Sequence, residues 1–185
     1  MSDNSVLFSQ SPRWMRHQHG IGNKLPKDLE PWLYESGSLT KKLRSHFGGH
    51  LGVKLIYQRW KPAFINESRL LQLNPEHFQL IREVMLHVDG KPLVLARTIL
   101  PKATIKIAQR NLSHLGARPL GEVIFAYPDL EKRQRQICYT QANIWSASIQ
   151  SEIIKAQPVW GRRTVYAIHQ QALLVAEFFL PAVYE

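Results

Sequence analysis

Apolar side chains recur at every second position in several stretches of the chain, a spacing typical of half-buried β-strands. Leu51–Trp60 has this alternation, and residues 78–88 and 91–100 repeat it on either side of Asp89-Gly90. A two-residue Asp-Gly turn between β-rich runs is the strongest short-range signal for a hairpin. The pattern therefore predicts one strand followed by an antiparallel hairpin.

The turn sets the register of this hairpin, and the expected register brings two arginines together. Counting outward from the turn pairs the residues of one face as follows: Val88 with Lys91, Leu86 with Leu93, Val84 with Leu95, and Arg82 with Arg97. Directly opposed like charges destabilise a sheet, and a buried guanidinium needs an acceptor. An anion bound between Arg82 and Arg97 would remove both objections. The alternative is that each arginine extends toward solvent or meets a carboxylate of its own.

A second hairpin is predicted at residues 160–180, with a polar turn at its centre. Glu177 interrupts the otherwise apolar run of its second strand. A strand this apolar is covered on both faces, so the carboxylate needs a partner. One reading is a buried ion pair with Arg82, Arg97 or Arg163. The other places the carboxylate beside an anion site, where it binds a substrate hydroxyl or moves a proton.

Two predicted helices begin with N–H groups that suit an anion. Ser38 is a typical N-cap for a helix over Leu39–Phe47, which two glycines end, and Pro119 starts a second, shorter helix. Their first residues, Leu39 and Leu120, present unpaired backbone N–H groups at the positive end of a helix. Such an end can hold a carboxylate, although a capped helix without a ligand is the commoner arrangement.

The remaining periodicity completes an α+β pattern. Further segments with recognisable spacing are 27–34 and 104–115 as helices, 134–139 as a strand, and 142–155 as either a strand or a helix. Antiparallel strands with helices inserted between them predict an α+β fold. We expect a single domain over residues 26–185 and a loosely ordered N-terminal arm over residues 1–25.

Composition narrows the class of partner. A formal net charge of +10 and a pI near 9.9 favour anionic partners. Basic residues occur as scattered pairs, without an aromatic-basic platform, so we expect no nucleic-acid partner. The histidines lack metal-site spacing, and we therefore expect no metal site.

Cysteine content and the apolar segments of the chain predict its cellular location and its oligomeric state. A single cysteine, Cys138, favours a reducing cytoplasm. No export signal and no run of ~18 apolar residues appears, so we expect no membrane insertion. No long apolar edge or heptad seam demands a second copy, and we expect a monomer.

Short blocks stand in order between about residues 30 and 181. They are Ser38-Leu-Thr-Lys-Lys42, Ile81-Arg-Glu-Val-Met-Leu86, Asp89-Gly-Lys-Pro92, Ala96-Arg-Thr-Ile-Leu-Pro101, Leu115-Gly116, Arg118-Pro-Leu-Gly121, Trp160-Gly-Arg-Arg163 and Leu174-Val-Ala-Glu-Phe-Phe-Leu-Pro181. Each block is weak, but together they are specific. In combination the chain resembles the chorismate pyruvate-lyase family, the 4-hydroxybenzoate synthases of bacterial ubiquinone biosynthesis.

The resemblance implies a six-stranded antiparallel sheet with helical flaps over an internal ligand, and elimination of pyruvate from chorismate without a cofactor. It also implies that Arg82 binds the ring carboxylate, helped by the N–H groups of Leu39 and Leu120, and that Glu177 meets the ring hydroxyl. From the register we add that Arg97 attracts the enolpyruvyl carboxylate. The expected catalytic residues are therefore Arg82, Arg97 and Glu177.

A second class of protein is an alternative to a lyase. The same fold serves as a non-catalytic effector-binding domain in bacterial transcription regulators, which would share the strand pattern. Those domains are normally joined to a DNA-binding helix-turn-helix domain, for which the N-terminal arm is too short.

Overall fold

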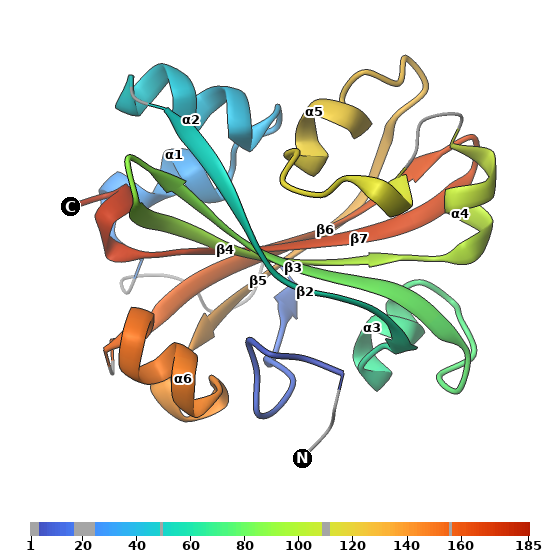
Figure 1. Cartoon of the computed structure of the whole chain (residues 1–185), viewed down its shortest axis with the longest axis horizontal. Helices are drawn as coiled ribbons and strands as arrows, with labels where there is room; N and C mark the ends of the chain where they lie inside the picture. The colour runs from blue at the N-terminus through green and yellow to red at the C-terminus, as the bar shows by residue number, and fades with distance from the viewer. Residues whose placement is uncertain (1–3, 17–24, 49, 109–111, 156) are drawn as a thin grey trace.

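Seven antiparallel strands form one twisted sheet in the order β1-β5-β6-β7-β4-β3-β2 (Figure 1). The computed structural model describes residues 4–16, 25–48, 50–108, 112–155 and 157–185. Because β1 has only two residues, the sheet consists of six long strands, and the predicted α+β fold is confirmed. The strands are β1 (Met15–Arg16), β2 (Leu51–Pro62), β3 (Phe78–Val88), β4 (Lys91–Leu100), β5 (Glu131–Thr140), β6 (Val159–Ile168) and β7 (Gln171–Phe179).

Helices lie on both sides of the sheet (Figure 1). We call the side under α1, α2 and α5 the ligand face, and the side under α3, α6 and the segment 4–16 the rear face. The helices are η2 (Lys27–Leu29), α1 (Glu30–Leu33), α2 (Leu39–Phe47), α3 (Ile65–Leu70), α4 (Lys102–Ile107), η3 (Leu112–His114), α5 (Leu120–Ile124), η4 (Ala142–Ile144), α6 (Ala147–Ile149), the π-helical turn η5 (Gln150–Ile154) and η6 (Pro181–Val183).

Side-chain alternation gives each face its own core. On β3, Val84 belongs to an apolar cluster with Leu33 of α1 and Leu43 of α2. The next residue, Met85, belongs to a cluster with Phe178 on the opposite face. Both faces of the central strands are therefore covered, which explains why β4 and β7 are apolar almost throughout.

The first hairpin has the predicted turn but not the predicted register. Asp89 and Gly90 both have positive φ, at 49° and 83°, as a two-residue hairpin turn requires. An irregularity follows at once: His87 pairs with Pro92, whereas Leu86 pairs with Val94. This leaves one extra residue on β4, where Pro92 cannot donate a ladder hydrogen bond.

The shift by one residue turns the face of β4 over. Arg82 pairs with Thr98, and Arg97 pairs with Glu83. The expectation that Arg82 and Arg97 oppose each other on one face is therefore wrong. Arg82 lies on the ligand face and Arg97 on the rear face.

The helix that begins at Leu39 is confirmed with its caps. Ser38 Oγ accepts a hydrogen bond from the Lys41 amide at 3.4 Å, and Gly48 ends the helix with φ of 64°. Residues 142–144 and 147–154 form short helical turns, which decides for a helix rather than a strand in that segment. The helix predicted over 104–115 is shorter, because α4 ends at Ile107 and residues 109–111 lie outside the described part.

The N-terminal arm is not loosely ordered where the structure describes it. Leu7 and Phe8 are 0% and 3% exposed. The Glu83 carboxylate accepts hydrogen bonds from the Val6 and Leu7 amides at 2.8 and 3.0 Å, and from the Ser5 hydroxyl at 2.6 Å. Residues 4–16 thus pack on the rear face of the domain, while residues 17–24 lie outside the described residues.

Candidate ligand site

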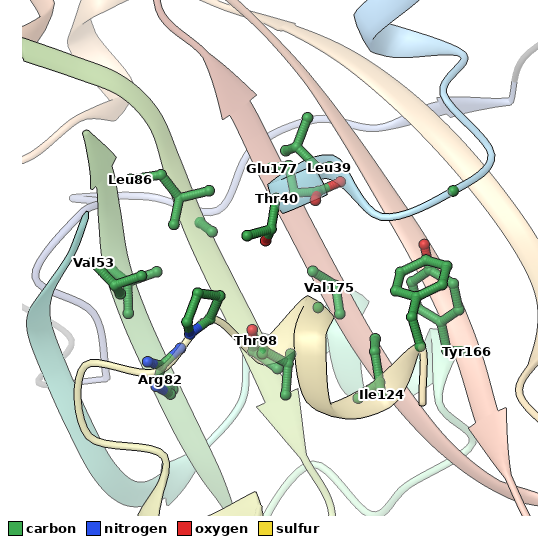
Figure 2. Close-up of a pocket in the computed structure, with 17 residues that line it drawn as sticks. Leu39, Thr40, Val53, Arg82, Leu86, Thr98, Ile124, Tyr166, Val175 and Glu177 are labelled. Atoms are coloured by element: carbon green, nitrogen blue, oxygen red, sulfur yellow. The ribbon is translucent and has the colours of Figure 1, made fainter. Parts of the chain in front are cut away.

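A pocket lies between the ligand face of the sheet and the N-terminal ends of α2 and α5 (Figure 2). Its walls are mostly apolar, and its polar side chains include Arg82 and Glu177, which Figure 2 shows on opposite sides of the cavity. A pocket with a few placed polar groups in an apolar wall is the usual form of a small-molecule site.

Arg82 supplies a buried positive charge at one side of the pocket. The side chain is 1% exposed, and its Nη2 donates hydrogen bonds to the carbonyl oxygens of Gly116 and Arg118 at 2.9 and 3.0 Å. Its Nε is buried without a hydrogen-bond partner, and no described carboxylate pairs with it. Burial lowers the pKa of Arg82 to about 10, because desolvation disfavours the charged guanidinium.

Glu177 supplies the negative charge at the other side. Its Oε2 accepts a hydrogen bond from Arg162 Nε at 2.6 Å, across the pair of β6 and β7. Its side chain remains 14% exposed, and among the described residues no donor bonds its Oε1. Glu177 therefore combines a fixed orientation with one carboxylate oxygen available to a ligand.

The partner of Glu177 is Arg162, which is not among the three arginines considered as partners from the sequence. The sequence carried the signal for it. His169 and Gln170 have φ of 46° and 67° and form a two-residue turn. Counting outward from that turn pairs Arg162 with Glu177, as the structure does.

Two helix ends close the pocket over the sheet. Leu39 and Thr40 line it from α2, and Leu120 and Gly121 line it from α5. An ion pair between Arg44 and Glu122 joins the two helices farther out. Figure 2 separates Leu39 clearly from Arg82 and draws it in the part of the view that holds Glu177.

Tyr166 and Thr98 complete the polar lining from the sheet floor. Both are buried, and Tyr166 lies on β6 near Glu177. Burial and the negative charge of Glu177 raise the pKa of Tyr166, so its hydroxyl keeps its proton at neutral pH. The site therefore offers a cation at one side and a carboxylate with a neutral phenol at the other.

Arg97 is absent from this lining, because it is fully engaged on the rear face. Its Nε and Nη2 donate to the Glu67 carboxylate at 2.8 and 3.0 Å, and its Nη1 donates to Glu83 Oε1 at 2.6 Å and to the Asn4 carbonyl. For Arg97 the structure therefore agrees with the alternative prediction, in which the arginine pairs with carboxylates of the protein. It cannot attract a ligand in the pocket from this position.

Substitution of Arg97 with methionine is expected to lower the free energy of unfolding by about 3–5 kcal/mol, because Glu67 and Glu83 would remain buried without a cation. Urea denaturation measures this loss. Substitution with lysine keeps the charge and should lose less. A methionine variant of normal stability that no longer binds ligand would contradict the placement of Arg97 on the rear face.

Among the described residues, no group of three or more histidine, cysteine, aspartate or glutamate side chains is arranged to hold a metal ion. No helix in the described part of the chain is long and apolar enough to cross a membrane.

Solved structures with the same fold include ligand-binding domains of bacterial regulators. The ligand-binding domain of a putative GntR-family regulator from Bordetella bronchiseptica matches with a TM-score of 0.53 at 14% identity, over 72% of this chain and 86% of that one. PhnF from Mycobacterium smegmatis matches with a TM-score of 0.57 at 15% identity, over 82% of this chain and 67% of that one. At these identities the likeness establishes the fold alone.

Sequence relatives are closer. A protein of Methylococcus capsulatus named "Probable chorismate pyruvate-lyase" is 42% identical over 84% of this chain and 96% of its own length. A protein of Shewanella loihica with the same name is 38% identical over 96% of this chain and 92% of its own length. The family description "Chorismate lyase" matches residues 10–185, and the chain therefore belongs to the chorismate lyase family.

Proposed function

We propose that this protein is a chorismate pyruvate-lyase, which converts chorismate to 4-hydroxybenzoate and pyruvate. The observation that carries the proposal is Arg82, a buried guanidinium without a described carboxylate partner, in a pocket that presents Glu177 at its other side. A ring with a carboxylate at one end and a hydroxyl at the other matches this polarity. Family membership supports the same assignment.

The carboxylate end of the ring is assigned to Arg82. A guanidinium gives a carboxylate charge-assisted hydrogen bonds, and the Nε of Arg82 is a buried donor without a described partner. The amide of Leu120, at the start of α5, lines the same pocket and adds a donor. The ligand then supplies the negative charge that the buried Arg82 lacks.

The hydroxyl end is assigned to Glu177, whose Oε1 can accept the hydroxyl hydrogen. Chorismate also carries an enolpyruvyl carboxylate next to this hydroxyl, and Arg97 lies on the wrong face to bind it. The amide of Leu39 stays assigned with that of Leu120 to the ring carboxylate, because Gly121 of α5 lies beside Ser38 and Thr40, so the two helix starts are adjacent.

The reaction needs orientation and charge stabilisation from the protein. The bond between the ring carbon and the enolpyruvyl oxygen breaks, and its electron pair stays on oxygen. The neighbouring carbon, which bears the hydroxyl, loses a proton, and that C–H electron pair completes the aromatic ring. The proton count closes when the methylene carbon of the released enolate is protonated to give pyruvate. Arg82 and Glu177 hold the ring so that the side chain lies over the departing hydrogen.

The proposal is tested by mixing the purified protein with chorismate and measuring pyruvate and 4-hydroxybenzoate together. We expect equal amounts of the two products at a rate proportional to protein. A protein that binds 4-hydroxybenzoate but releases no pyruvate from chorismate would instead be a non-catalytic effector-binding domain.

The close contact between the two flaps gives a further prediction. A Cβ added to Gly121 would lie 3.3 Å from Thr40 Oγ1 and 3.4 Å from Ser38 Oγ. Substitution with valine adds two more carbons and should push α5 away from α2, weakening 4-hydroxybenzoate binding about 10-fold. Titration calorimetry measures the change, and unaltered affinity would show that the flaps separate freely. Substitution of Ala126 with valine is the control, because Ala126 is exposed, closely follows α5 and does not line the pocket.

We further place the reaction in the supply of 4-hydroxybenzoate for ubiquinone biosynthesis, in the cytoplasm, with a monomer as the active form. Support for the pathway comes from membership of the chorismate lyase family. Restored ubiquinone synthesis in a bacterium that lacks its own chorismate lyase tests the first point. Light scattering during gel filtration tests the third.

A further inference from the structure

Arg162 connects the candidate catalytic carboxylate to the segment that leads into α2. The side chain is 1% exposed. Its Nε donates to Glu177 Oε2 at 2.6 Å, while its Nη1 donates to the carbonyl oxygens of Trp32 and Glu35 at 2.9 and 2.8 Å, with Leu33 at 3.4 Å. One guanidinium therefore touches β7 on one side and the end of α1 on the other.

The carbonyls that Arg162 binds belong to the short segment 32–37, which ends α1 and precedes α2. Carbonyl groups at a helix end have no partner within the helix and attract cations. Arg135 Nη2 also donates to the Glu35 carbonyl at 2.8 Å, and Lys132 Nζ donates to the Ser36 carbonyl at 3.0 Å. Cations of β5 and β6 thus hold this segment against the sheet.

The same segment determines where the α2 end of the pocket lies. The Glu35 carboxylate accepts a hydrogen bond from the Gly37 amide at 2.7 Å, and Gly37, Leu39 and Thr40 line the pocket. A displacement of the Glu35 backbone would therefore move pocket residues only two to five positions farther along the chain. Of the cations on the segment, Arg162 is the one that also hydrogen-bonds Glu177.

We propose that Arg162 is a positioning residue for the lyase reaction, which fixes the Glu177 carboxylate relative to the α2 flap. The proposal rests on the proposed function, because it assigns Arg162 the task of aligning the hydroxyl-binding group with the flap that closes on the substrate. Arg162 itself does not line the pocket.

The two-sided contact requires an arginine. The guanidinium presents donors in a rigid fork, so Nε and Nη1 reach different partners at once. A lysine would keep the charge but concentrate it at one nitrogen, which can serve Glu177 or the carbonyls but not both in the present geometry. Charge alone should therefore not restore the function of Arg162.

The experiment is a double-substitution cycle of Arg162→Lys and Glu177→Gln, measured by kcat and KM for chorismate. We expect Arg162→Lys alone to lower kcat about 10- to 100-fold, as the loss of a group that orients a catalytic residue commonly does. In the Glu177→Gln background the same substitution should change kcat less than 3-fold, because the residue that it positions has already lost its function. Melting temperatures of all variants show whether each one is folded at the assay temperature.

Arg133→Gln is the matched control, because Arg133 lies on β5 and bonds the exposed residues Glu131 and Gln170. Arg133→Gln should leave kcat unchanged in the wild type, and it should also leave kcat unchanged when it is combined with Glu177→Gln. If Arg162→Lys retains wild-type kcat, or if its effect multiplies with that of Glu177→Gln, Arg162 is a structural residue and the proposal is overturned. A wild-type protein without lyase activity would contradict the proposed function instead, which keeps the two failures distinct.

Discussion

Substitution of Arg82 with methionine is expected to abolish chorismate turnover and, at the same time, to stabilise the folded protein. The guanidinium is buried, its Nε has no partner, and its pKa is lowered to about 10. Replacing such a cation with an apolar side chain of similar length removes a desolvation cost that outweighs the two lost hydrogen bonds to the Gly116 and Arg118 carbonyls. We therefore expect the free energy of unfolding to rise by about 1 kcal/mol. The loss of the carboxylate contact should lower kcat/KM roughly 100-fold or more.

The two effects are measured on the same protein samples. Urea denaturation gives stability, and pyruvate release gives kcat/KM. Binding of 4-hydroxybenzoate should raise the melting temperature of the wild type and leave that of the Arg82→Met variant almost unchanged. Arg97→Met is the contrasting control, because it should lose stability. An Arg82→Met variant that is less stable and still active would show that Arg82 has a structural role.

Substitution of Glu177 with glutamine is the second change with a large expected effect. The variant keeps the shape of the side chain but leaves the Arg162 guanidinium without a counterion and presents a weaker acceptor to the substrate hydroxyl. We expect kcat to fall about 100-fold or more. Stability should fall by about 1–3 kcal/mol, since a buried charge loses its paired partner.

The preference for 4-hydroxybenzoate over benzoate distinguishes a lost contact with the hydroxyl from a loss of stability. The wild type should bind 4-hydroxybenzoate more tightly than benzoate, which lacks the hydroxyl that Glu177 accepts. In Glu177→Gln this preference should shrink, whereas a loss of stability alone would weaken both ligands equally. Equal preference in the wild type and the variant, by calorimetry, would remove Glu177 from the hydroxyl end.

The sequence singled out two charged residues that line the pocket, because both anomalies are local. A charged residue at an alternating position of an apolar strand is visible without knowledge of neighbouring strands. Arg82 and Glu177 both stand at such positions of their strands. The starts of α2 and α5 could also be predicted from the sequence, because Ser38 and Pro119 are the N-cap residues of those helices.

Arg97 was misplaced because register depends on a feature that the alternation pattern does not reveal. The irregularity next to Pro92 inserts one residue, and a one-residue shift transfers every later side chain of β4 to the other face. The sequence does contain Pro92, which is unusual inside a hairpin strand. It signals a possible bulge but does not locate the extra residue.

The contacts that could not be predicted from the sequence join residues far apart in the chain. Glu83 holds the segment 4–16, and Arg162 holds carbonyl groups about 130 positions earlier. Backbone carbonyls have no side-chain signature, so a side chain that binds them cannot be paired by pattern. Only the packing of α1 against β6 brings these groups together.

The most direct test of the central claim is the structure of the complex with 4-hydroxybenzoate. The carboxylate of the ligand should accept a hydrogen bond from Arg82 Nε near the start of α5, and the hydroxyl should donate to Glu177 Oε1. A ligand bound with its hydroxyl at Arg82 and its carboxylate near Glu177, or bound outside this pocket, would contradict the account.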